Sequence, residues 1–200
     1  RAAFPVGSPD GGKSPGPVSS GLARSASGAS PAIDWLEIIS ENFFAEGGAT
    51  RRRFDDLLAR RPLVPHGVSL SIGGTDPFDP TYLANLRRVV RATGAPWFSD
   101  HLCFTGVGGR ESHDLLPLPY RPEVVAHVVD RIRTVEDAIG IPFAIENVSS
   151  YLTYEESTLT EWEFVREIAE RADCGILLDV NNVFVSGKNH GFDPEDYLRA

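Results

Sequence analysis

The sequence predicts an α/β protein built as a TIM (β/α) barrel, and three observations lead to this fold class. Strand-like apolar runs alternate with helix-like amphipathic runs, which is the pattern of βαβ units with a parallel sheet. No glycine-rich phosphate loop follows the first clear strand, as it would in an open dinucleotide-binding sheet. Polar side chains able to bind metal gather at the ends of the predicted strands, where barrel enzymes place their active sites.

The predicted strands are short apolar runs bounded by turn residues, at 33–39, 63–71, 96–104, 142–148 and 175–180. Amphipathic helices are predicted between them at 50–60, 80–93, 122–139 and 161–172, and a last helix opens at Asp193 or Pro194. The helix starts are well marked, and Asp193 before Pro194 is one of the signals. Asp79 precedes Pro80 as an N-cap followed by proline, and Thr160 with Glu163 has the spacing of a capping box.

The first 30 residues differ in composition from the rest. Residues 1–30 are dominated by Gly, Ser, Pro and Ala, which predicts a disordered or linker-like segment with room for one short strand at 18–23. Residues 31–200 are predicted to form the barrel domain. Because the chain begins at Arg1 and contains no Met, we expect it to be a piece of a longer product.

Charge and cysteine content narrow the function classes. A formal net charge of −9 argues against a nucleic-acid partner, since such proteins usually carry a basic excess. No apolar run approaches the roughly 18 residues of a membrane span, so a cytoplasmic location without a membrane partner is expected. Cys103 and Cys174 both lie in apolar segments, which predicts reduced, buried thiols.

The predicted strand ends carry imidazoles and carboxylates, namely His66, His101, Glu146, Asp179 and His190. This mixed set without thiolate suits iron, manganese or zinc, and its size suggests more than one ion. Taken singly, the same residues have ordinary explanations. His66 could be a core histidine, Glu37 and Asp100 could accept structural hydrogen bonds, and Asn147, Asn181 and Asn182 are residues that favour turns. His113 and His127 are expected to face solvent or to pack.

Five motifs are more specific than this general pattern. HGVSLSIGG, SDHLCF, DLLPLPY, ENVSSY and LLDVNNVFVSGKNHGFDP together resemble the family of multinuclear non-haem iron-dependent oxidative enzymes, long classed as an uncharacterised protein family, which includes the methanobactin biosynthesis oxygenase. The resemblance implies a xylose-isomerase-like barrel that binds two or three iron ions, Fe(II) and Fe(III). It also implies use of O2 to modify cysteine residues of a ribosomally made precursor peptide, with a small peptide-recognition protein as partner.

The resemblance also implies a ligand set. The metal ligands of the family match His66, His101, Glu146, Asp179, Asn182 and His190, and we expect Glu37 and Asp100 to orient ligand imidazoles by hydrogen bonds. No residue is identified as a general base. Two departures stand out: only Ser20–Arg24 resembles the family's glycine-rich first strand, and the family continues for two further strands that bring another His, Asp and Glu. A barrel truncated at its C-terminus is therefore expected.

Two other functions fit the same residues. A divalent-metal isomerase, epimerase or phosphodiesterase would use the same ligands with manganese or zinc, because a ligand set does not fix oxidation state. Turnover of a sugar or of abasic DNA without O2 would favour this alternative. A non-catalytic fragment is the second alternative, and the lack of a cooperative thermal transition would favour it.

Overall fold

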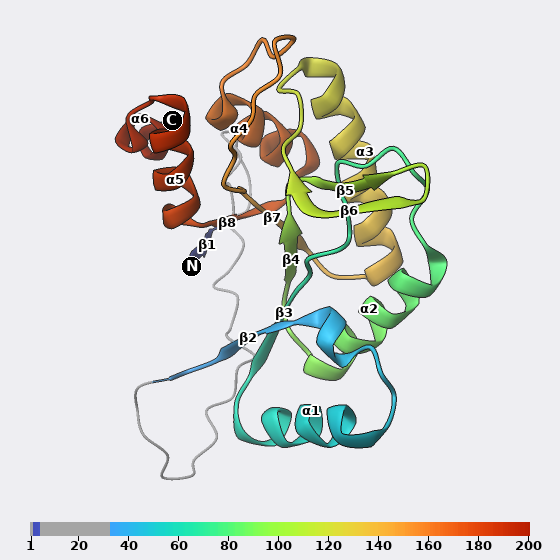
Figure 1. The fold of residues 1–200 in the computed structure, drawn as a ribbon. Helices are drawn as coiled ribbons and strands as arrows, with labels where there is room; N and C mark the ends of the chain where they lie inside the picture. Colours follow the sequence, from blue (N-terminus) through green and yellow to red (C-terminus); the bar gives the residue numbers. More distant parts are fainter. Residues whose placement is uncertain (1, 5–32) are drawn as a thin grey trace, which may run out of the picture.

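The computed structural model describes residues 2–4 and 33–200, and these form an α/β structure around one main sheet (Figure 1). The sheet has the strand order β1-β8-β7-β4-β3-β2. Its strands are β1 (Ala2–Phe4), β2 (Leu36–Ile39), β3 (Leu63–His66), β4 (Phe98–His101), β7 (Phe143–Glu146) and β8 (Gly175–Leu178). All neighbours pair in parallel except β1, which is antiparallel to β8.

The order of the parallel strands supports a TIM-like arrangement. From β2 through β3, β4 and β7 to β8, each new strand is added at the same edge of the sheet. A doubly wound sheet reverses direction at a switch point, whereas a (β/α) barrel does not. The predicted α/β class with a mainly parallel sheet is therefore confirmed. Closure into a barrel stays a prediction, because β2 and β1 are the outer strands of this sheet.

The helices follow the predicted order, and they are α1 (Gly48–Arg60), α2 (Pro80–Thr93), α3 (Pro122–Ile139), α4 (Glu161–Ala172), α5 (Val180–His190) and α6 (Pro194–Arg199), with a 3-10 turn at Ser40–Phe43. The predicted start signals at Asp79 and Thr160 are confirmed. The Asp79 carboxylate accepts a hydrogen bond from the Thr81 backbone N at 2.8 Å, and Thr160 and Glu163 form a complete capping box. Within the described part of the chain, none of these helices is long and apolar enough to cross a membrane.

Helices α2, α3 and α4 cover one face of the sheet and form the core with it. Leu86 of α2, Ile132 of α3 and Phe164 of α4 are buried in one cluster with Phe98 and Phe143 of the sheet, whose rings lie 4.9 Å apart. Burial of each such side chain stabilises the fold by about 1.5–3 kcal/mol. The strand ends are therefore fixed by a well-packed layer. The two cysteines, Cys103 and Cys174, are buried free thiols as predicted.

The sequence prediction missed a hairpin and a helix. The hairpin consists of β5 (Phe104–Val107) and β6 (Arg110–Leu116). Its turn residues Gly108 and Gly109 have φ values of 60° and 72°, which suit glycine and a tight two-residue turn. The missed helix is α5, in a segment predicted as a strand exit. The N-terminal segment predicted as a linker lies almost entirely outside the described residues, as does the strand at 18–23.

Candidate metal centre

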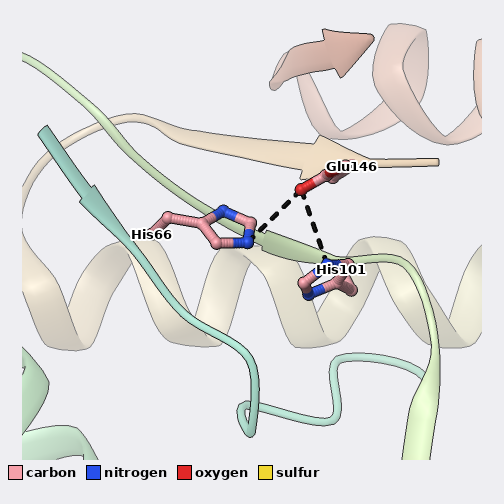
Figure 2. A group of neighbouring side chains, drawn as sticks. All are labelled: His66, His101 and Glu146. Carbon is pink, nitrogen blue, oxygen red and sulfur yellow. Dashed lines mark ion pairs between the residues drawn. The ribbon is translucent and has the colours of Figure 1, made fainter. Parts of the chain in front are cut away.

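Three of the predicted ligands meet at the carboxyl ends of three neighbouring strands (Figure 2). His66, His101 and Glu146 are the last residues of β3, β4 and β7. His101 and Glu146 pair directly in the sheet register, and His66 pairs with Ser99 of β4. Because parallel strands align their carboxyl ends, residues separated by up to 80 positions (66 to 146) become neighbours. All three side chains are buried, and Glu146 is fully inaccessible.

The geometry of this trio fits the ligand sphere of one ion. The Glu146 Oε2 atom lies 3.3 Å from His66 Nε2 and 3.6 Å from His101 Nε2, the contacts drawn in Figure 2. Two ligand atoms bound to the same ion at about 2.1 Å, with an angle of about 90–110° between them, lie about 3.0–3.4 Å apart. One ligand atom from each residue lies within 4.8 Å of the others. A single metal ion could therefore be shared by all three.

Two polar residues, Ser99 and Asp100, lie beside the imidazoles. Ser99 Oγ is 2.9 Å from His66 Nδ1, so this contact fixes the ring with its other nitrogen, Nε2, toward Glu146. Such a contact on the far ring nitrogen is typical of metal-bound histidines. Asp100 Oδ1 lies 3.8 Å from His101 Nδ1, longer than a hydrogen bond, and accepts instead from the His101 backbone N at 2.7 Å. Its expected contact with the His101 ring stays a prediction.

Asp100 itself is an unusual carboxyl group. It is 1% exposed, and burial, followed by the charge of Glu41, raises its pKa well above the ordinary value. Its second oxygen accepts from the Leu70 backbone N at 3.2 Å. The group therefore ties β4 to the loop after β3. Glu37 lies on β2 in register with Val64, and its expected role in orienting a ligand stays a prediction.

The other predicted ligands, Asp179, Asn182 and His190, follow β8 and lie along α5. Asp179 caps this helix, because its carboxylate accepts from the Asn182 backbone N at 3.0 Å. His190 Nε2 lies 2.8 Å from Ser150 Oγ and 3.0 Å from the Ser150 backbone O. Among the described residues, the group whose ligand atoms converge within 4.8 Å contains neither Asp179 nor His190. Their role as ligands stays a prediction.

The polar side of α5 holds the segment that follows β7, residues 147–150, here called the β7 loop. Asn182 Nδ2 donates to the Asn147 backbone O at 3.0 Å. Ser186 Oγ accepts from the Ser150 backbone N at 3.0 Å, and Asn189 Nδ2 donates to the Ser150 backbone O at 2.8 Å. Each bond satisfies a backbone group that the irregular loop cannot pair with itself. The asparagine-rich sequence of α5 thus positions the loop next to Glu146.

A cavity of about 230 Å³ adjoins the trio and is lined by His101, Asp114, Leu115, Val148, Ser149, Tyr151 and Asn182. His101 belongs both to the trio and to this cavity. Two of these lining residues are in contact, because the Tyr151 hydroxyl donates to the Asp114 carboxylate. The sequence prediction did not identify Ser99, Asp114 or Tyr151. Their positions inside the SDHLCF, DLLPLPY and ENVSSY motifs were the available signal.

Glu161 is a further buried acid that the sequence prediction missed. It is 8% exposed, and burial raises its pKa to about 7. The Tyr197 hydroxyl donates to it at 3.3 Å, and Tyr120 hydrogen-bonds both to Glu161 and to Ser150 of the β7 loop. The first turn of a helix normally favours an ionised, exposed acid, so position alone gave no sign of this burial.

His127, expected to pack or face solvent, is half-buried with Nε2 2.9 Å from the Gly74 backbone O, and His113 is exposed.

Comparison with known proteins identifies the family. Residues 19–200 match the family model described as RiPP precursor modification enzyme MbnB/TglH/ChrH. The chain belongs to this family. It is 53% identical over 170 residues to a UPF0276 protein of Anaeromyxobacter sp. (strain Fw109-5), covering 85% of this chain and 60% of that protein. A UPF0276 protein of Caulobacter vibrioides (strain NA1000 / CB15N) is 44% identical over 85% of this chain and 61% of its own.

A UPF0276 protein of Haemophilus influenzae (strain ATCC 51907 / DSM 11121 / KW20 / Rd) is 44% identical over 84% of this chain and 54% of its own. The chain therefore spans a little over half of the length of these relatives. The trio and the cavity lie within the part that the family model matches. Membership in this family confirms the resemblance stated from the motifs.

Proposed function

We propose that this chain is part of a multinuclear iron-dependent oxidase or oxygenase that modifies cysteine residues of a ribosomally synthesised precursor peptide. The observation that carries the proposal is the convergence of His66, His101 and Glu146 in a chain of the RiPP-modifying family. Two imidazoles and a carboxylate are ligands that iron accepts readily, with manganese and zinc as the alternatives. Thiolate does not occur in the trio, which argues against a purely structural zinc site.

Each residue of the trio would have its own role in holding the ion. His66 and His101 would bind the ion through Nε2, and Glu146 would supply a negative charge that stabilises a cation in this buried site. Ser99 would hold the His66 ring in place. Bound iron would supply one-electron chemistry with O2 as the oxidant. Because His101 also lines the cavity, a substrate seated there would lie directly beside the ion.

The remaining predicted ligands would serve further ions. Asp179, Asn182 and His190 are proposed as ligands of a second or third iron, by resemblance to the family. The Nε2 atom of His190 contacts Ser150, which would leave Nδ1 for a metal. Glu37 and Asp100 are proposed to orient the imidazoles. The proposed partners are a cysteine-containing precursor peptide and a small peptide-recognition protein, in the cytoplasm.

Anaerobic reconstitution with Fe(II), followed by metal analysis and oxygen-electrode measurements, tests this function. We expect stoichiometric iron, and O2 consumption that depends on a cysteine-containing peptide and not on its serine analogue. Glu170 is an exposed acid on α4, and Glu170→Gln should leave iron content and O2 consumption unchanged. Uptake of zinc alone with no O2 consumption would contradict the proposal and favour a metal-dependent isomerase or phosphodiesterase. A chain without a cooperative thermal transition would favour a non-catalytic fragment.

A further inference from the structure

The cavity beside His101 has the size of a site for one residue of a peptide. Its volume is about 230 Å³, below the roughly 300–1,000 Å³ of pockets that enclose a whole small-molecule ligand. Leu115 and Val148 give it an apolar part, and Asp114, Ser149, Tyr151 and Asn182 give it a polar part. A peptide residue, with a side chain and backbone polar groups, matches this mixture of polar and apolar walls.

The polar side of the cavity is rich in hydrogen-bond acceptors. Asp114 Oδ1 accepts from the Leu115 backbone N at 2.9 Å, and Asp114 Oδ2 accepts from the Tyr151 hydroxyl. These two bonds orient the carboxylate, and both Asp114 and Tyr151 are exposed, so a ligand can reach them. Each carboxylate oxygen has two acceptor positions, so Asp114 can accept further bonds from a ligand. The Tyr151 oxygen donates its proton to Asp114 and can itself accept. The ligand that suits this wall presents N–H groups.

Two parts of the chain that come from different elements build this wall. Asp114 and Leu115 lie on β6 of the hairpin, which the Asp76 carboxylate secures by accepting from the Gly108 and Gly109 backbone N atoms at 3.0 and 2.9 Å. Val148 and Ser149 lie on the β7 loop, which α5 holds through Asn182 and Ser186. Hydrogen bonds to other parts of the chain therefore support the backbone on both sides, and this lowers the entropic cost of binding.

We propose that this cavity is the subsite for the residue of the substrate peptide next to the reacting cysteine, and that Asp114, oriented by Tyr151, binds the backbone N–H of that residue. This inference rests on the proposed function, because it places the cysteine thiol at the ion held by His101. Asp114 then positions the substrate peptide and sets the specificity for it. It favours a thiol that belongs to a peptide over a free thiol of similar reactivity.

The test uses the chain loaded anaerobically with Co(II), whose absorption changes when a thiolate binds. Three probes are compared: N-acetylcysteine N-methylamide, N-acetylcysteine methyl ester and ethanethiol. The amide and the ester differ by one N–H group. We expect the amide to bind about tenfold more tightly than the ester, the contribution of one hydrogen bond to a charged acceptor. Asp114→Asn and Tyr151→Phe should abolish most of this difference while leaving Co(II) content and ethanethiol binding unchanged.

Two variants outside the cavity serve as controls. Glu111→Gln removes a charge from the same strand, and Tyr154→Phe removes a hydroxyl from the segment that carries Tyr151; both should keep the preference for the amide. A thiolate band with equal affinity for amide and ester, or a preference that survives in Asp114→Asn and Tyr151→Phe, would overturn the subsite and leave the proposed function standing. Stoichiometric Co(II) with no thiolate band for any probe would overturn the subsite and the proposed role in cysteine modification together.

Discussion

The ends of β3, β4 and β7 and the segment after β8 carry the same types of side chain and make different contacts. At the first three strand ends, His66, His101 and Glu146 point at one another and are buried. After β8, Asp179 caps helix α5, whose polar groups hold the β7 loop. Convergence of the ligand atoms is observed for the first group, and the ligand role of the residues after β8 stays a prediction. A shared site requires that the elements bring the ligand atoms to one point.

The largest expected effect comes from the trio. Glu146→Gln keeps the size of the side chain but removes the charge that would neutralise a cation in a fully buried site. We expect iron affinity to fall at least about 100-fold, as measured by competition with a chromophoric chelator. Glu170→Gln is the matched control on an exposed face. Equal affinity in the two variants would mean that the trio is not the metal site.

The buried carboxyl group of Glu161 should make the free energy of unfolding depend on pH. Burial raises the pKa of Glu161 to about 7 from its ordinary value of 4.5, so between these values the folded protein binds more protons than the unfolded chain. The free energy of unfolding attributed to this group therefore falls as pH rises from about 4.5 to about 7, and it levels off above.

Glu161→Gln removes this loss. Relative to the wild type, we expect the variant to gain about 2–3 kcal/mol in the free energy of unfolding between pH 4.5 and pH 8. Urea unfolding at several pH values measures it, with Glu170→Gln as the reference. Parallel stability profiles for Glu161→Gln and the wild type would show that Glu161 is ionised in the fold and that the region is more hydrated than the structure indicates.

A smaller effect on iron affinity is expected for Ser99, which contacts His66 of the trio. Ser99→Ala removes the hydroxyl that lies 2.9 Å from His66 Nδ1, and we expect about tenfold weaker iron binding because the ring loses its fixed orientation. Ser99→Thr restores a hydroxyl and should recover most of the affinity. If Ser99→Ala binds iron as tightly as the wild type, the ring is held by its packing alone.

The smallest effect is expected for Ser186→Ala, which tests whether helix α5 and the trio are independent of each other. Ser186 is fully buried, and Ser186→Ala leaves the Ser150 backbone N without its acceptor. We expect the free energy of unfolding to fall by about 1 kcal/mol or somewhat more, while iron affinity at the trio stays within about twofold of the wild type. Ser69→Ala, at an exposed position, is the control. A large loss of iron from Ser186→Ala would show that α5 and the trio form one unit.

Local signals in the sequence predicted much of the fold. Alternation of apolar runs gave the five parallel strands, and the Asp79–Pro80 pair and the Thr160 capping box marked helix starts that the structure confirms. Helix α5 was missed because asparagines and Gly187 are poor helix formers, and its stability comes from the Asp179 cap and from bonds to the β7 loop. The hairpin was missed although its Gly108–Gly109 pair is a recognised turn signal.

The sequence predicted part of the site, namely the residues that end neighbouring strands. His66, His101 and Glu146 end neighbouring parallel strands, so sequence pattern and sheet geometry together place them at one point. Ser99, Asp114, Tyr151 and Glu161 carry no such pattern. Their importance depends on which long-range contacts the fold makes, and the contact between Tyr151 and Asp114 spans 37 positions of the chain.

Anomalous X-ray diffraction from crystals of the iron-loaded protein, recorded on both sides of the iron absorption edge, tests most directly whether the trio holds one ion. The predicted result is an iron peak about 2.0–2.3 Å from His66 Nε2, His101 Nε2 and a Glu146 carboxylate oxygen at once. A peak bound by other residues, with these three side chains still in mutual contact, would contradict it.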